Sequence, residues 1–154
     1  MSSTVQTVVI IGALIIVLAL SVVMQLFRAR RSPLGRVIKI YEDLSRIEKF
    51  CDDPVYRPKA GRLSTDAWDK YREKVGFLPE EIKTDLTRLF DMAGEINTDI
   101  DASARVNSGM ALAAVNTEKL RTPLTSCRGK LKDWISENLH NREYLPKKFG
   151  VFSH

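Results

Sequence analysis

The N-terminal segment from Val5 to Phe27 is an apolar run of 23 residues without one charged side chain. As a helix rising about 1.5 Å per residue it would be roughly 34 Å long, enough to cross a hydrocarbon core of about 30 Å. Its few polar residues, such as Gln6 and Gln25, lie toward the two ends. We therefore predict a transmembrane helix over residues 5–27, retained as a signal anchor.

Two alternatives compete with this interpretation. A cleaved signal peptide would begin with basic residues and have a shorter apolar core, whereas residues 1–4 carry no charged side chain and the bases follow the run. A buried helix in the core of a soluble protein rarely runs this long without a polar face. The pattern favours the retained anchor over both.

Basic residues dominate the segment that follows, and no acid appears before Glu42. The positive-inside rule then predicts that residues 1–4 lie outside and the remainder in the cytoplasm. We expect a single-pass protein of a bacterial inner (plasma) membrane. Binding of membrane lipid headgroups is a second use for these bases, less favoured than setting the topology. The membrane-flank residues are Arg28, Arg30, Arg31, Arg36 and Lys39.

Beyond the basic linker of residues 28–33, apolar residues recur at helical spacing and predict a bundle over residues 34–140. Ser32-Pro33 suits the start of a first helix, over residues 34–51. Residues 52–64 contain two prolines and a glycine and are predicted to form a loop. A short helix is expected to begin at Ser64 or Thr65, either of which can cap it, and to continue through Val75 and end at Gly76.

A long helix is predicted over residues 79–107, since Leu78-Pro79 precedes two acids that suit a helix N-terminus. Its apolar residues alternate at spacings of four and three from Ile82 to Ile100, as in a coiled coil. This stripe predicts packing inside the bundle, with a homo-oligomer seam as the alternative.

A last helical stretch is predicted over residues 110–139 and contains Thr122-Pro123. Either a new helix starts at Pro123, or one helix continues through it with a kink; we favour a kinked or barely broken pair. The fold class is thus all-α, a transmembrane helix followed by a small antiparallel bundle of roughly four helices. Residues 141–154 are predicted to be a basic aromatic tail without regular structure.

Little in the sequence indicates catalysis. Cys51 and Cys127 lie on apolar helix faces and are expected to be buried free thiols. Asp99, Asp101 and Ser103 have the spacing of a calcium loop, but the positions that need glycine and glutamate hold Ala104 and Met110. We predict no metal, no cofactor and no catalytic residue.

The favoured function is a non-enzymatic, membrane-tethered interaction or scaffold protein, or an accessory subunit of a larger membrane complex. A protein partner or self-association is expected, and nucleic-acid binding is not, because no recognisable module accompanies the basic tail. The alternatives are a protein that binds anionic lipid surfaces and a small enzyme that uses His140. The candidate partner-binding residues are Tyr56, Arg57, Arg62, Trp68, Tyr71, Tyr144, Lys147, Lys148 and Phe149.

Overall fold

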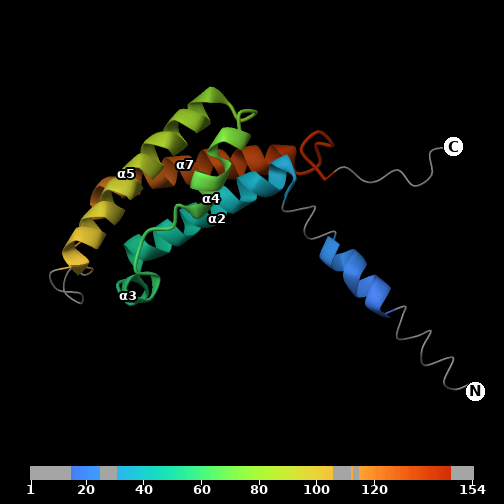
Figure 1. The fold of residues 1–154 in the computed structure, drawn as a ribbon. Coiled ribbons are helices and arrows are strands. Elements are labelled where there is room, and N and C mark those ends of the chain that lie inside the picture. Colours follow the sequence, from blue (N-terminus) through green and yellow to red (C-terminus); the bar gives the residue numbers. More distant parts are fainter. Residues whose placement is uncertain (1–14, 25–30, 106–111, 113–114, 147–154) are drawn as a thin grey trace, which may run out of the picture.

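The structure is a computed structural model that describes residues 15–24, 31–105, 112 and 115–146. These residues form helices, turns and bends and contain no β-strand, so the predicted all-α fold is confirmed for them (Figure 1). Residues 15–24 are helical and precede the bundle in the chain. The bundle elements are α2 (Pro33–Asp52), α3 (Tyr56–Ala60), α4 (Asp66–Tyr71), the 3-10 helix η1 (Arg72–Lys74), α5 (Glu80–Ala104) and α7 (Glu118–Asn138).

Helix α2 begins and ends close to the predicted residues. The Ser32 hydroxyl accepts a hydrogen bond from the Gly35 amide at 3.0 Å, and Pro33 occupies the first turn, where its missing N–H costs nothing. The helix ends at Asp52, before Pro54. Its apolar face supplies much of the core, including Phe50 at 1% exposed.

The predicted loop over residues 52–64 contains one short helix, α3, which the two prolines had argued against. Pro58 is the third residue of α3, where no helical N–H donor is needed. Gly61 ends the helix with φ of 69°, a left-handed conformation that favours glycine. The predicted short helix at residues 64–75 is divided between α4 and η1.

Helix α5 confirms the predicted long helix and the preferred use of its apolar stripe. The stripe residues are all at most 8% exposed within the single chain, so they pack inside the bundle. These residues are Ile82, Leu86, Leu89, Ala93, Ile96 and Ile100. A homo-oligomer seam is not needed to bury them.

Helix α7 is continuous through Pro123, so no new helix starts there. It begins at Glu118, while most of residues 110–114, where the sequence predicted the start, lie outside the described residues. The Asn116 side chain accepts the Glu118 amide at 3.0 Å and caps the first turn. Pro123 removes only the hydrogen bond to the Lys119 carbonyl, and apolar packing of Leu120 and Leu124 on either side holds the helix together.

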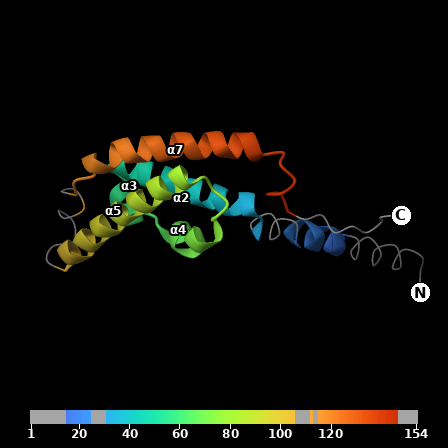
Figure 2. The same cartoon turned by 90° about the horizontal axis from the view of Figure 1, so that it is seen from above.

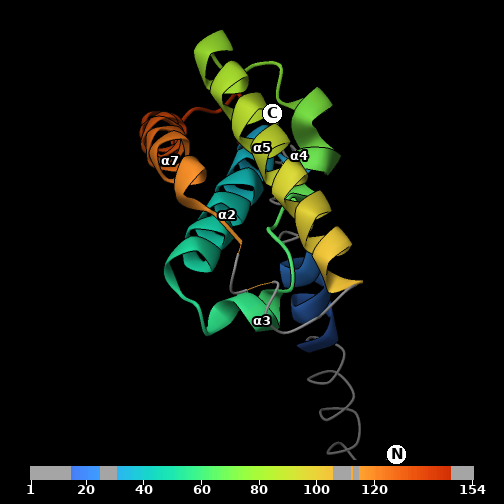
Figure 3. The same cartoon turned by 90° about the vertical axis from the view of Figure 1, so that its left-hand side faces the viewer.

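The three long helices are joined through α7, which packs against both α2 and α5 (Figure 2). Arg121 pairs with Asp52 and Arg128 with Glu48, so α7 runs antiparallel to α2. Lys130 pairs with Asp85 and Glu81 near the start of α5, and Figure 2 shows α7 and α5 running in opposite directions. The predicted helical bundle is therefore confirmed, with α4 packed against α2 on the side away from α7 (Figure 3).

Two buried polar side chains hold the connection between α3 and α4. Asn97 of α5, 3% exposed, accepts the Leu63 amide at 2.8 Å and donates to the Leu63 carbonyl at 3.0 Å. Asp43 of α2, 2% exposed, accepts the Ser64 hydroxyl at 2.6 Å and the Ala67 amide at 2.7 Å. Because Ala67 is in the first turn of α4, Asp43 caps that helix from a neighbouring element.

The predicted membrane span is corrected by the structure. Of residues 5–27, the structure describes only 15–24, which are helical; the remainder of the predicted span lies outside the described residues. Among the residues that the structure describes, no helix combines the length and the apolar character that a bilayer crossing requires. The predicted localisation as a single-pass membrane protein, with its inside and outside assignments, is therefore wrong.

Candidate interaction surfaces

The helix of residues 15–24 is the most exposed apolar element described. Figures 1 and 2 show it standing apart from the bundle. Its eight large apolar side chains are between 46% and 64% exposed and lie on every face, because no charged residue interrupts them. Continuous exposed apolar surface of this kind marks a place where a protein meets another molecule.

The described membrane-flank residues belong to the start of α2 and its neighbours. Arg36 donates to the Lys74 carbonyl at 3.4 Å and so ties α2 to η1. Lys39 pairs with Glu42 at 2.7 Å on its own helix. Arg31 is exposed just before Ser32, and Arg28 and Arg30 lie outside the described residues.

The three candidates from the predicted loop are all engaged within the bundle. Tyr56 packs against the core, with the Lys49 ammonium 4.7 Å from its ring centre. Arg57 is half-buried and donates to the carbonyls of Phe50 and Cys51 in the last turn of α2. Arg62 is exposed and pairs with Asp101 at 3.5 Å.

The two aromatic candidates on α4 serve packing. Trp68 is 5% exposed and stacks on Phe90, with ring centres 5.2 Å apart and planes 7° from parallel. Tyr71 is half-buried against the core. These two rings therefore form the inner face of a short helix.

Tyr144 belongs to an aromatic cluster at the end of the bundle where α2 begins. Its ring centre is 5.2 Å from those of both Phe77 and Trp134, and its carbonyl accepts the Leu34 amide at 3.1 Å. Residues 141–146 thus close over the first turn of α2 instead of extending freely. Lys147, Lys148 and Phe149 lie outside the described residues.

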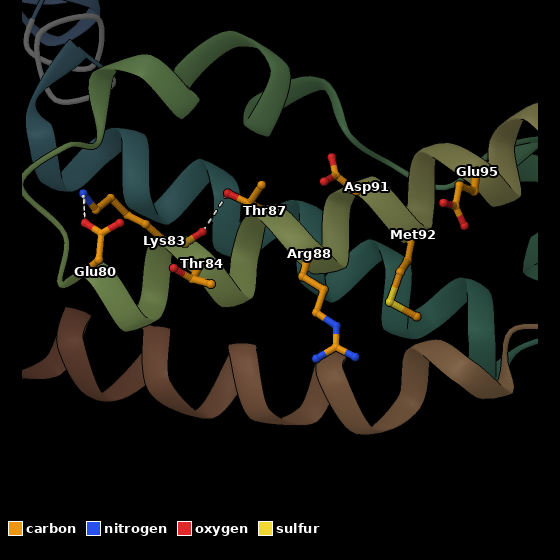
Figure 4. A pocket seen from close by; sticks show the side chains of 8 residues that line it. All are labelled: Glu80, Lys83, Thr84, Thr87, Arg88, Asp91, Met92 and Glu95. Atoms are coloured by element: carbon orange, nitrogen blue, oxygen red, sulfur yellow. Dashed lines mark hydrogen bonds and ion pairs between the residues drawn. The ribbon is translucent and has the colours of Figure 1, made fainter.

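Two shallow hollows lie on the surface of α5. One, of about 490 Å³, runs along α5 itself (Figure 4), where Lys83 is held by Glu80 at 2.6 Å. Its lining residues are Glu80, Lys83, Thr84, Thr87, Arg88, Asp91, Met92 and Glu95. The other, of about 410 Å³, lies between α5 and α7. Arg88, which sequence reasoning did not single out, lines both.

The predicted buried free thiols are confirmed. Cys51 is 4% exposed and Cys127 is 2% exposed. Burial raises the pKa of the Cys127 thiol to about 11, with a smaller contribution from the nearby Asp85 carboxylate. Burial also raises the pKa of Cys51, opposed by a hydrogen bond with Thr117. Both thiols stay protonated near neutral pH, which suits packing and not nucleophilic chemistry.

The acidic residues with calcium-loop spacing and His140 are exposed surface residues. Asp99 and Asp101 lie on the exposed face of α5. His140 is exposed just beyond α7, and His154 is outside the described residues. Among the residues that the structure describes, no three His, Cys, Asp or Glu side chains come together as a metal site would require.

Comparison with known proteins adds no relative, because no protein-family model, curated protein or solved structure matches this chain.

Proposed function

We propose that this protein is a helical interaction subunit, which joins another protein through the helix of residues 15–24 and presents the bundle beside it. The observation that carries the proposal is the exposure of that helix on every face. Fully burying one Val, Leu, Ile or Met side chain contributes about 1.5–3 kcal/mol, so covering the exposed half of these eight side chains can support a stable complex.

The shape of the exposed surface favours a groove on a different protein as the binding site. Ile16 and Leu18 are 61% and 57% exposed, yet at 3.6 residues per turn they lie about 200° apart around the helix. Pairing with one identical helix would cover one side only. An apolar groove between elements of a partner would cover both sides of the helix. Amphipathic helices bind partners in this way through one apolar face, and here the groove would need apolar walls on both sides.

Site-specific crosslinking tests the proposal in the full-length chain. A photoreactive amino acid is placed at Ile16, at Leu18 or, as the control, at Val55, which is apolar and 71% exposed on the bundle. We expect positions 16 and 18 to crosslink to the same second protein, identified by mass spectrometry, while position 55 does not. Crosslinks only to a second copy of this chain, or only to lipid, would overturn the proposal.

A paired substitution gives a second readout. Leu18→Asp with Val22→Asp places two charges on the helix, and Val55→Asp with Leu139→Asp places two charges at exposed apolar positions of the bundle. Wild-type protein should co-purify with the crosslinked partner at a fixed stoichiometry. We expect the first pair of substitutions to abolish this co-purification and the second pair to leave the stoichiometry unchanged. Equal loss from both pairs would show that the helix is not the contact.

A further inference from the structure

The hollow between α5 and α7 is lined by a cation, Arg88, for which the described part of the chain supplies no counter-ion. Its lining residues are Asp85, Arg88, Thr122, Pro123, Ser126 and Cys127. The other bases beside it on α7 are paired: Arg121 with Asp52 at 2.9 Å and Lys130 with Asp85 at 2.6 Å. Arg88 has neither an ion pair nor a hydrogen bond to any residue that the structure describes.

Two hydroxyl groups in the hollow are also free to bind. Hydroxyl residues inside helices usually donate to the carbonyl four residues earlier. Five of them do so here: Ser45, Thr87, Thr98, Thr125 and Ser136. Thr122 and Ser126 make no such bond within the described part of the chain, and both face the hollow with Arg88.

The nearby acids do not cancel the charge of Arg88. Asp85 is neutralised by Lys130, whose pKa is raised by its hydrogen bonds with Asp85 and Glu81, so that it stays charged. Asp91 lies three residues after Arg88, but Figure 4 shows the Arg88 guanidinium directed toward α7 and the Asp91 carboxylate on the other side of α5. The hollow therefore offers a planar cation beside two hydroxyl donors.

We propose that the hollow between α5 and α7 binds an oxyanion, a phosphate or carboxylate group, through the Arg88 guanidinium and the hydroxyls of Thr122 and Ser126. Arginine presents paired N–H donors that match two oxygens of such a group, and hydroxyls complete the coordination. At about 410 Å³ the hollow has room for the oxyanion and part of the molecule that carries it. This site is independent of the helix of residues 15–24.

The test follows the arginine side-chain N–H signals of full-length protein, labelled with ¹⁵N-arginine and kept in a neutral detergent. Inorganic phosphate, acetate and chloride are titrated separately at constant ionic strength, and Arg88→Lys assigns the Arg88 signal. We expect a saturable shift of that signal with phosphate or acetate and none with chloride. Whichever of the two oxyanions binds at least fivefold more tightly identifies the carrier group, and equal affinity assigns the site to both.

Matched variants separate the site from general charge. Thr122→Val with Ser126→Ala keeps Arg88 and should weaken oxyanion binding by about fivefold or more. Arg105→Gln removes an exposed arginine directly after α5 and should leave oxyanion binding unchanged. Far-ultraviolet circular dichroism checks that each variant is folded. A shift of Arg88 that does not saturate, that chloride reproduces, or that the hydroxyl variant leaves unchanged would overturn the proposal.

Discussion

Individual buried polar residues determine where the short elements of this bundle lie. Asn97 is three residues before Ile100 and four after Ala93, on the buried face of α5. An apolar side chain there would pack equally well in several registers. An amide that needs both the N–H and the C=O of Leu63 permits one position of the connecting segment only.

Asn97→Ala should lower the free energy of unfolding by about 2–4 kcal/mol, because both backbone groups of Leu63 would then be buried without partners. Urea denaturation, followed by circular dichroism, measures the change as a lower midpoint. The matched control is Thr98→Ala, an exposed neighbour whose hydroxyl bonds only within α5, at Gly94. An Asn97→Ala midpoint within error of the Thr98→Ala midpoint would contradict the role of Asn97.

The buried thiol of Cys127 makes stability depend on alkaline pH. Below its ordinary pKa of 9.0 the thiol is protonated in both the folded and the unfolded chain. Above that pH the unfolded chain loses the proton first, so stability falls until the folded thiol titrates near pH 11. Between pH 8 and pH 11 wild-type protein should lose about 2–3 kcal/mol more than Cys127→Ala. Parallel pH profiles of unfolding free energy for the two proteins would refute this expectation.

At the scale of elements, α3 acts as a clamp on the end of α2. Arg57 of α3 donates from Nε to the Phe50 carbonyl at 2.9 Å and from Nη2 to the Cys51 carbonyl at 3.0 Å. The same Nη2 lies 3.4 Å from the Thr117 hydroxyl, just before α7. One guanidinium therefore satisfies carbonyls that a helix C-terminus leaves free and links three helices.

Arg57→Lys tests whether this contact requires the shape of guanidinium or only its charge. An ammonium cannot reach two carbonyls and a hydroxyl in the same geometry, so we expect a loss of about 1–2 kcal/mol in unfolding free energy. Lys59→Arg, an exposed change on the same helix, should be neutral. Thermal unfolding of the two variants makes the comparison, and an Arg57→Lys variant as stable as wild type would show that charge is sufficient.

The long elements were predictable and the short connections were not, for one physical reason. Helices α2 and α5 each bury a stripe of apolar side chains, and that periodicity is visible in the sequence. Helix α3 has no buried residue; Gly61 ends it, and Arg57 ties it to the Phe50 and Cys51 carbonyls and to the Thr117 hydroxyl. The polar residues Asp43 and Asn97 did give a signal, since both interrupt an apolar face at helical spacing.

The candidate surfaces were harder to predict, because exposure depends on tertiary neighbours. Trp68 and Tyr144 have the aromatic character of partner anchors, yet Phe90 covers one and Phe77 with Trp134 the other. Arg88 is an ordinary helical arginine in the sequence. Only the approach of α7 places it beside Thr122 and Ser126.

At the scale of the whole molecule, the C-terminal segment completes the bundle. Residues 141–146 pass the aromatic pair Phe77 and Trp134 and supply the carbonyl of Tyr144 to the first turn of α2. The packing joins the start of the first bundle helix to the segment after the last one. Residues 141–146, part of the tail predicted to lack regular structure, therefore form turns that pack against the bundle.

Tyr144→Ala should remove the ring that lies against Phe77 and Trp134 and lower unfolding free energy by about 2–4 kcal/mol. Amide hydrogen exchange should also become faster at Leu34, whose N–H bonds to the Tyr144 carbonyl. Arg142→Ala, an exposed change in the same segment, is the control. Unchanged exchange at Leu34 in Tyr144→Ala would indicate that the backbone contact does not depend on the ring.

The hydrogen bond between Leu34 and Tyr144 also decides how the bundle responds to a mechanical load. Because the chain enters and leaves the bundle at the same end, tension applied between residues 31 and 146 would act first on this contact. It would peel the C-terminal segment away before it could draw α7 from α2 and α5. For the same reason the whole bundle could be inserted into a surface loop of a host protein with little separation of the loop's two ends.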